Sequence, residues 1–331
     1  MMVPRAALAA ALALAFLAAP LAAGAQQAVK VWRIGILSPS TTPSETARRQ
    51  SPLMQKLAEL GYVENQNLVV EYRAAEGKID RLPELAVELV QVKVDAIFTA
   101  SSPGVQAARK ATNVIPIVFT GVNDPVGLGL VASLARPGGN VTGVSTLLGG
   151  DLVAKQLQLL KEVIPRVSRI AILWNPTNPG STAAMKDTEV VAPSLGVKIV
   201  PVAMGTPSDL NSAFSTIVRE RAEALAVHAT APMWEQRTQI LDFAVQKRLP
   251  ALSFVREFAQ AGALMTYGPD LADHLRLAAG YLDKIFKGAR PADLPVLQAT
   301  QFELVINLKT AKALSLTIPP SVLLRADQVI E

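Results

Sequence analysis

Polar residues in this 331-residue chain follow its short β-branched runs, at places where a small molecule can be held. In open α/β sheets, ligands bind beyond the carboxyl ends of the strands, where helix N-termini present free N–H groups and a positive dipole. Hydroxyls and amides there can hold a carboxylate without a buried cation, and an acid can hold an ammonium group. This chemistry suits an α-amino acid or another small carboxylate. The candidate binding residues are Ser38, Ser101, Ser102, Asn123, Asp124, Asn175, His228, Glu257 and Tyr267.

Most of these candidates also have a structural alternative, which the sequence leaves open. Ser101 and Ser102 can be simple helix N-caps, and Asn123-Asp124 before Pro125 is a common turn dipeptide. The remaining alternatives are a hydrogen-bonded, half-buried role for His228, a helix-dipole partner for Glu257 and a hinge residue for Tyr267.

Patterns typical of enzymes are weak in this sequence. Residues 127–132 match G-x-G-x-x-A, but they do not follow the first strand of a βαβ unit, so a chance match is the better interpretation. No G-x-S-x-G, H-E-x-x-H or P-loop motif is present, and the two histidines, His228 and His274, are isolated. The absence of cysteine excludes disulfides, thiolate metal sites and a cysteine nucleophile. We therefore expect neither an enzyme nor a bound metal or cofactor.

The first 25 residues resemble a cleavable signal peptide. Arg5 supplies a positive charge, Ala6–Ala19 form a weakly apolar run, and Ala23-Gly24-Ala25 is a small-residue cleavage site before Gln26. We expect export to the periplasm with cleavage after Ala25. Because the chain has no cysteine to acylate, the mature protein is expected to be free and not a lipoprotein.

The positive charge of the chain is dispersed. The formal net charge is +5, but the longest clusters are pairs such as Arg48-Arg49 and Lys247-Arg248. A nucleic-acid-binding surface would need a basic stripe interleaved with aromatic residues. We therefore expect no nucleic-acid partner.

Short apolar runs alternate with segments of helical period from about residue 32 to the C-terminus. Nearly continuous apolar runs are typical of parallel strands that are covered on both faces. The clearest helix starts after Asp270, a predicted N-cap, and ends before Gly288. This alternation predicts an α/β fold with doubly wound parallel sheets. The predicted strands are 34–37, 68–72, 94–98, 115–119, 169–173, 197–202, 224–227, 251–253, 263–266 and 302–306.

The strands fall into two groups, which predicts two lobes joined by three crossing segments. The crossings are expected in 136–145, in 265–269 and around 299–307. The N-terminal lobe is then 28–144 plus 268–300, and the C-terminal lobe is 145–267 plus 301–331. We expect a ligand in the cleft between them, with Ser101 and Ser102 contributed by the first lobe and Asn175, His228 and Glu257 by the second.

Six motifs are spread over the mature chain: WRIGILS at 32–38, LGYVENQNL at 60–68, NDPV at 123–126, ARPGGNVTG at 135–143, MTYGPD at 265–270 and FELVINLKTAKAL at 302–314. Together they resemble the ABC transporter substrate-binding protein family, over essentially the whole mature chain. This resemblance implies the type I periplasmic-binding-protein fold, with the ligand in the cleft, and some members of the family take aromatic amino acids. Many relatives outside Gram-negative bacteria carry a lipoprotein cysteine, from which this sequence departs.

Three functions remain as hypotheses from the sequence. The first is a monomeric solute receptor that closes its lobes on a small ligand and delivers it to the permease of an ABC importer in the inner membrane. The second is a sensory ligand-binding protein of the same fold that signals to a membrane receptor. The third, a periplasmic hydrolase or reductase, is disfavoured because no catalytic constellation is present.

Overall fold

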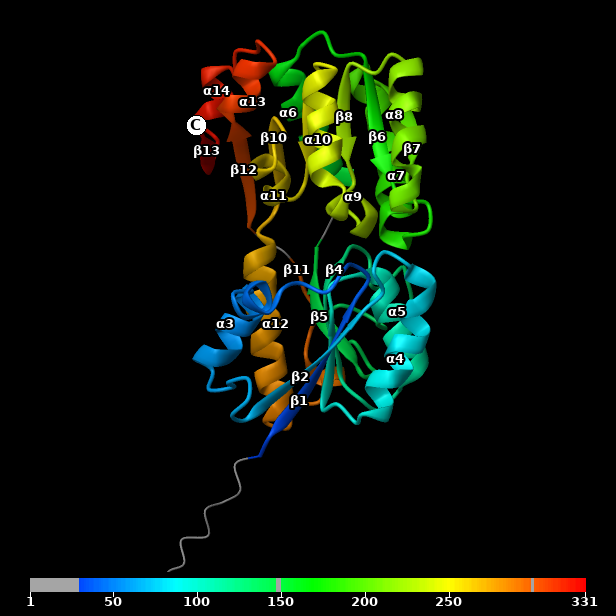
Figure 1. The fold of residues 1–331 in the computed structure, drawn as a ribbon, viewed down its shortest axis with the longest axis vertical. Coiled ribbons are helices and arrows are strands. Elements are labelled where there is room, and N and C mark those ends of the chain that lie inside the picture. Colours follow the sequence, from blue (N-terminus) through cyan, green and yellow to red (C-terminus); the bar gives the residue numbers. More distant parts are fainter. Residues whose placement is uncertain (1–29, 147–149, 299–300) are drawn as a thin grey trace, which may run out of the picture. The chain divides into compact units, whose positions relative to one another are not determined.

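The computed structural model describes residues 30–146, 150–298 and 301–331. By its internal contacts the chain divides into a segment that ends at Val31 and a unit formed by Trp32–Glu331, and the fold is that of the second unit. The predicted signal peptide lies outside the described residues. Among the helices that are described, none is both long and apolar enough to cross a bilayer. The predicted α/β class and two-lobe architecture are confirmed (Figure 1).

A parallel sheet of six described strands forms the first lobe, in the order β11-β5-β4-β3-β1-β2. Successive side chains of a strand alternate between faces, so Ile97 and Phe98 belong to different cores. Helices α4 and α5 cover the face of Ile97, and α3 and α12 cover the face of Phe98. The bounds are β1 Trp32–Ser38, α2 Glu45–Arg49, α3 Pro52–Glu59, β2 Leu68–Ala74, α4 Leu82–Gln91, β3 Ala96–Thr99, α5 Ser102–Ala111, β4 Ile117–Val122, β5 Val141–Ser145, α12 Leu271–Phe286 and β11 Leu297–Gln298.

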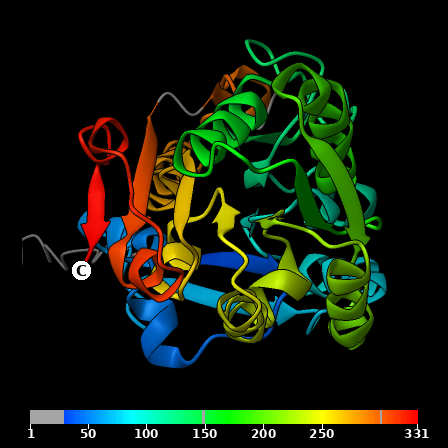
Figure 2. The same ribbon diagram turned by 90° about the horizontal axis from the view of Figure 1, so that it is seen from above.

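A mixed sheet of seven described strands forms the second lobe, in the order β13-β12-β10-β9-β8-β6-β7. Helices α6, α7, α13 and α14 pack on one face, and α8, α10 and α11 pack on the other. Figure 2 shows β12 and β13 at the edge of this sheet. The bounds are α6 Gly150–Val163, β6 Arg169–Trp174, α7 Pro179–Val191, β7 Lys198–Ala203, α8 Leu210–Arg219, β8 Ala224–Val227, α9 Ala231–Glu235, α10 Arg237–Gln246, β9 Ala251–Ser253, α11 Arg256–Gln260, β10 Met265–Pro269, β12 Phe302–Asn307, α13 Leu308–Ala313, α14 Pro320–Leu323 and β13 Gln328–Ile330.

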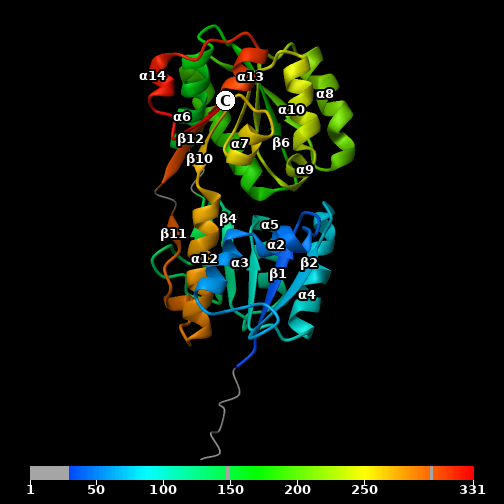
Figure 3. The same cartoon turned by 60° about the vertical axis from the view of Figure 1, so that its left-hand side comes forward.

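Strand β12 departs from the expected all-parallel sheet, because it pairs antiparallel with β10. The reason is connectivity. β10 leads out of the second sheet into α12, which packs against α3 in the first lobe, and the chain returns through β11 to enter the second sheet beside β10 (Figure 3). Two neighbouring strands that lead out of and back into one sheet run in opposite directions.

The predicted N-cap of α12 and the glycine beyond its C-terminus are both present. The Asp270 carboxylate accepts hydrogen bonds from the backbone N–H groups of Ala272 and Asp273, at 2.8 and 3.2 Å. Beyond the helix, Gly288 has φ +100°, a left-handed conformation that favours glycine. Between the lobes the chain passes from β5 to α6, from β10 to α12 and from β11 to β12. The lobe boundaries at 144/145, 267/268 and 300/301 stay a prediction.

A candidate ligand cavity between the two lobes

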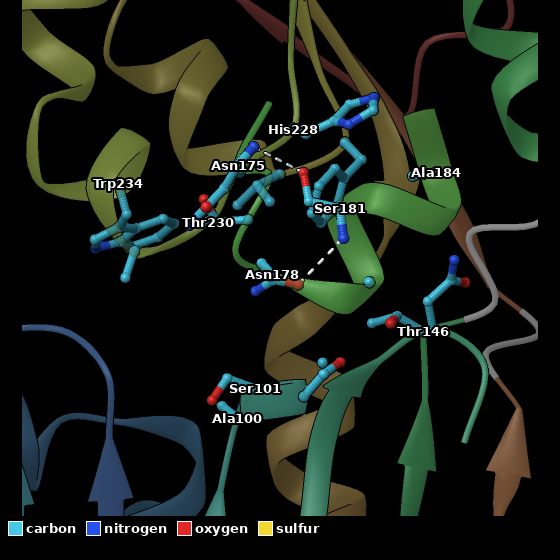
Figure 4. A pocket seen from close by; sticks show the side chains of 18 of the residues that line it. Ala100, Ser101, Thr146, Asn175, Asn178, Ser181, Ala184, His228, Thr230 and Trp234 are labelled. Atoms are coloured by element: carbon cyan, nitrogen blue, oxygen red, sulfur yellow. Dashed lines mark hydrogen bonds between the residues drawn. The ribbon is translucent and has the colours of Figure 1, made fainter. Parts of the chain in front are cut away.

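A cavity of about 410 Å³ lies between the carboxyl ends of the strands of the two sheets (Figure 4). The structure brings seven of the nine candidate residues to its wall and leaves Asp124 and Tyr267 out of it. The polar wall also contains residues that the sequence analysis missed. The seven are Ser38, Ser101, Ser102, Asn123, Asn175, His228 and Glu257, and the further polar ones include Ser40, Thr146, Gln156, Asn178, Ser181 and Thr230.

The first lobe contributes the N-terminus of α5. Ser101 is its N-cap, and the Ser101 hydroxyl accepts a hydrogen bond from the backbone N–H of Gly104 at 3.1 Å. Ser101 therefore does act as a helix N-cap, and it also lines the cavity. Ser102 is buried at the first position of the helix. A side chain at Gly104 would place its Cβ 2.1 Å from the Thr99 hydroxyl, so glycine allows the helix to start this close to β3.

The second lobe contributes the N-terminus of α7, whose N-cap Asn178 is not among the nine candidates. Asn178 caps this helix by accepting from the Ser181 N–H at 3.1 Å, and the Ser181 hydroxyl accepts from the Asn175 N–H at 3.0 Å. A Cβ on Gly180 would lie 3.3 Å from the Ser102 hydroxyl. The two helix N-termini, one from each lobe, therefore meet across the cavity. The signal in the sequence is Asn178-Pro179, an N-cap residue followed by proline at the first helical position.

Asn175 is fully buried and holds the turn that follows β6. Its side-chain oxygen accepts from the Thr177 N–H at 2.9 Å and from the Thr177 hydroxyl at 2.8 Å. Its side-chain nitrogen, Nδ2, has no hydrogen-bond partner among the described residues. A buried donor without an acceptor is costly. An acceptor on a ligand in the cavity would therefore be bound favourably here.

His228 is neutral at physiological pH. Burial lowers the pKa of its imidazole to about 4, against a smaller opposing effect of a hydrogen bond with the Ser181 backbone. The imidazole Nδ1 is buried without a partner among the described residues. His228 can therefore offer a neutral ring, but not a positive charge, to a ligand.

We expect the stability of the unliganded protein to fall with acidification because of His228. The unfolded chain binds a proton near pH 6.5, whereas the folded chain resists protonation until about pH 4. The free energy of unfolding of the wild type minus that of His228→Gln should therefore be constant above pH 7. It should fall as the pH falls from 6.5 toward 4. Urea unfolding at several pH values measures it, and a difference that stays constant down to pH 4 would contradict the assignment.

Apolar side chains also line the cavity. Trp234 on α9 lines it, with the Arg237 guanidinium 5.2 Å from the Trp234 ring centroid and the Phe258 ring behind it at 6.2 Å. Figure 4 shows Trp234 beside Thr230, away from Thr146. Among the described residues, Glu257 is the one carboxylate that lines the cavity, and no lysine or arginine does. The wall also includes Phe254, Leu271 and Leu275.

Asp124 and Tyr267 take the structural roles that the sequence left open. The Asp124 carboxylate accepts from the Gly127 N–H at 2.8 Å, as in a turn. It also faces the second lobe, where burial and the Asp124 charge raise the pKa of Asp187. The Tyr267 ring stacks on Phe302 with centroids 6.0 Å apart, between β10 and β12, where the chain crosses between lobes.

Comparison with known proteins adds to this geometry. A family model described as "ABC transporter substrate binding protein" matches residues 33–330. A "Tyrosine-binding protein" of Clostridioides difficile (strain R20291) is 30% identical over 264 residues, which are 80% of this chain and 75% of that protein. A crystal structure of a conserved domain protein from Vibrio cholerae has 31% identity and a TM-score of 0.84, and covers 91% of this chain and 100% of that one.

Two further structures differ in the state of their ligand site. Both are 26% identical and cover 91% of this chain, with 100% and 99% of their own chains covered. A domain from Streptococcus pneumonia in complex with L-Trp has a TM-score of 0.82, whereas a ligand-free, open substrate-binding protein from Clostridium difficile has 0.63. As a whole, the chain therefore superposes better on the complex with L-Trp than on the ligand-free protein.

Proposed function

Because this chain belongs to the ABC transporter substrate-binding protein family, we propose that it is the receptor of an ABC importer and binds an α-amino acid between its lobes. The observation that carries the proposal is the meeting of two helix N-termini, α5 and α7, at a cavity that no described lysine or arginine lines. Helix N-termini bind anions through their free N–H groups and their dipoles.

In this proposal the ligand carboxylate lies in the cavity beside these two helix N-termini, within reach of both. Ser102 supplies a hydroxyl from the first lobe, and Asn175 supplies its buried Nδ2 donor from the second. The ligand ammonium group is placed against Glu257, the one acid in the described wall. The cavity then has one anionic group and two helix N-termini, which matches a zwitterion.

The ligand side chain is placed at the Trp234 end of the cavity, where the wall is apolar. An aromatic side chain fits this environment because ring pairs gain about 0.5–1.5 kcal/mol beyond their area burial. A relative named for tyrosine binding and a neighbour in complex with L-Trp support the same class of ligand.

Contacts from both lobes make the ligand a bridge, so binding favours the closed state over the open one. In our proposal a closed, monomeric complex then docks on the permease in the inner membrane, after export to the periplasm by the predicted signal peptide. No chemical step is involved.

The proposal is tested by ligand-induced stabilisation of the purified mature protein. A bound ligand raises the free energy of unfolding by about 2.7 kcal/mol at a hundredfold excess over Kd. We expect sharp thermal shifts with L-tryptophan, L-tyrosine or L-phenylalanine, and none with their decarboxylated amines, which lack the anion that the helix N-termini bind. A response to sugars or nucleosides with no response to any amino acid would overturn the ligand class.

A further inference from the structure

Glu235, the last residue of α9 in the second lobe, reaches across to the first lobe. The backbone N–H of Thr41 donates a hydrogen bond to Glu235 Oε1 at 3.1 Å. A Cβ on Gly77 would lie 3.3 Å from Glu235 Oε2, so both carboxylate oxygens are against the first lobe. Gly77 has φ +79°, which favours glycine at this close approach.

The same short helix also faces the ligand cavity. Trp234, the residue before Glu235, lines the cavity, as do Pro39 and Ser40, the residues before Thr41. Figure 3 shows α9 at the end of the second lobe that is nearest to the first. A ligand beside Trp234 is therefore enclosed by a contact made one residue away, between Glu235 and the segment 39–41.

The electrostatics of this contact oppose closure. Burial raises the pKa of the Glu235 carboxyl, the Thr41 N–H lowers it, and the Glu76 carboxylate raises it further. In an open form the lobes separate and Glu235 returns to water, away from Glu76. The closed form then binds a proton at Glu235 more tightly than the open form, so a falling pH favours closure.

The neighbouring charges do not offset this effect. Arg81 lies 3.8 Å from Glu76, but the two side chains are 40% and 63% exposed, so screening weakens the influence of Arg81. Asp209 accepts from the N–H groups of Gly205 and Thr206. Besides Glu76, the charged residues closest in sequence to these contacts are Lys78, Asp80 and Arg81 in the first lobe and Asp209 and Arg237 in the second.

We propose that Glu235 is a proton-dependent clasp, which holds the segment 39–41 of the first lobe over the Trp234 end of the cavity and closes more readily when its carboxylate is neutralised. Glu235 contacts the other lobe and not the ligand, so it is a positioning residue that acts on the lobes. Its effect on ligand retention rests on the proposed function, whereas its effect on closure does not.

Closure is measured without ligand by the distance between two spin labels. The chain has no cysteine, so Val87→Cys on α4 and Val218→Cys on α8, which replace exposed valines of the two lobes, provide unique labelling sites. In proteins that also carry His228→Gln, which removes the opposing titration of His228 in the cavity wall, we expect the closed fraction to rise severalfold between pH 8 and pH 5. In Glu235→Gln, which keeps an acceptor for Thr41 but has no charge, it should already be raised at pH 8 and respond less to pH.

A matched control variant and one further titrating group define what this experiment should show. Glu220→Gln removes an exposed carboxylate paired with Arg219 in the same lobe and should leave the pH response unchanged. Asp187, whose pKa is raised by burial and by Asp124 across the cleft, should account for part of the response that remains in Glu235→Gln. A pH response of Glu235→Gln equal to that of the wild type would overturn the proposal.

Glu235→Ala separates the hydrogen bond from the charge. Because alanine offers no acceptor to Thr41, its closed fraction should be lower than that of Glu235→Gln at every pH. Equal closure in the two variants would show that the hydrogen bond contributes nothing and would overturn the clasp.

L-tryptophan is the probe for retention. We expect its dissociation from the wild type to slow severalfold from pH 8 to pH 5, and dissociation from Glu235→Gln to be slow already at pH 8. If no amino acid binds at any pH, the proposed function fails while the label distances still decide the clasp. Normal binding with unchanged label distances would reject the clasp and leave the proposed function intact.

Discussion

Replacing Asn175 by aspartate is expected to weaken binding of the amino-acid ligand by roughly a hundredfold, which corresponds to about 3 kcal/mol. The substitution keeps the side-chain oxygen that accepts from the Thr177 N–H and hydroxyl. It replaces the unpartnered Nδ2 donor by an oxygen that carries negative charge. A fixed carboxylate at this buried position of the cavity wall then repels the ligand carboxylate.

Isothermal titration with L-tryptophan at pH 7.5 measures this loss. Asn211→Asp on α8 makes the same chemical change at an exposed residue and should leave the affinity unchanged. Thermal melting without ligand shows whether the turn at 175–178 is preserved. Full affinity in Asn175→Asp, with a lowered melting temperature, would mean that Asn175 only holds this turn and that the anion site lies elsewhere in the cavity.

Gly268→Ala is expected to cost about 3 kcal/mol or more of the free energy of unfolding. A Cβ at this position of β10 would lie 2.0 Å from the Phe254 carbonyl oxygen. Because the obstacle is backbone, no rotamer change relieves it, and the β9–α11 connection or β10 must move. Phe254 lines the cavity, so this movement should also weaken ligand binding.

Gly280→Ala is the matched control for this prediction. Gly280 lies within α12, and no atom beyond its own helix backbone and chain neighbours is within 4 Å of its added Cβ. Alanine is the better helix former by about 1 kcal/mol, so this variant should be slightly more stable than the wild type. Urea denaturation of both variants gives the comparison. If Gly268→Ala were as stable as Gly280→Ala, β10 would be able to move away from the Phe254 carbonyl without loss of stability, and the prediction would be wrong.

The elements that the sequence determined are those with a local physical cause. Long apolar runs gave the central strands, such as β6 and β8, because only a strand covered on both faces needs them. The start of α12 was predictable from Asp270, and Ser101 was a possible start of α5, because an N-cap acts on N–H groups within three residues. Their place after strands was enough to bring seven candidate residues to one cavity.

The family resemblance was also readable from the sequence, and it is confirmed by the match over residues 33–330. It implied the fold and the class of protein, because the motifs that carry it are spread over the whole chain. It did not indicate which polar side chains would form hydrogen bonds within the protein and so be lost to a ligand. Asn175 illustrates this, because its oxygen serves a turn and only its nitrogen is left for a ligand.

The tertiary structure alone decided which residues meet. The α7 N-terminus, Trp234 and the contact of Glu235 with Thr41 join residues far apart in the chain, and no local pattern encodes such a meeting. Asp124 and Tyr267 stood at plausible positions but are directed to a turn and to the crossing of the chain between the lobes. The edge strands β11 and β13 were missed, because a strand of two or three largely exposed residues has no apolar period and exists only through its partner.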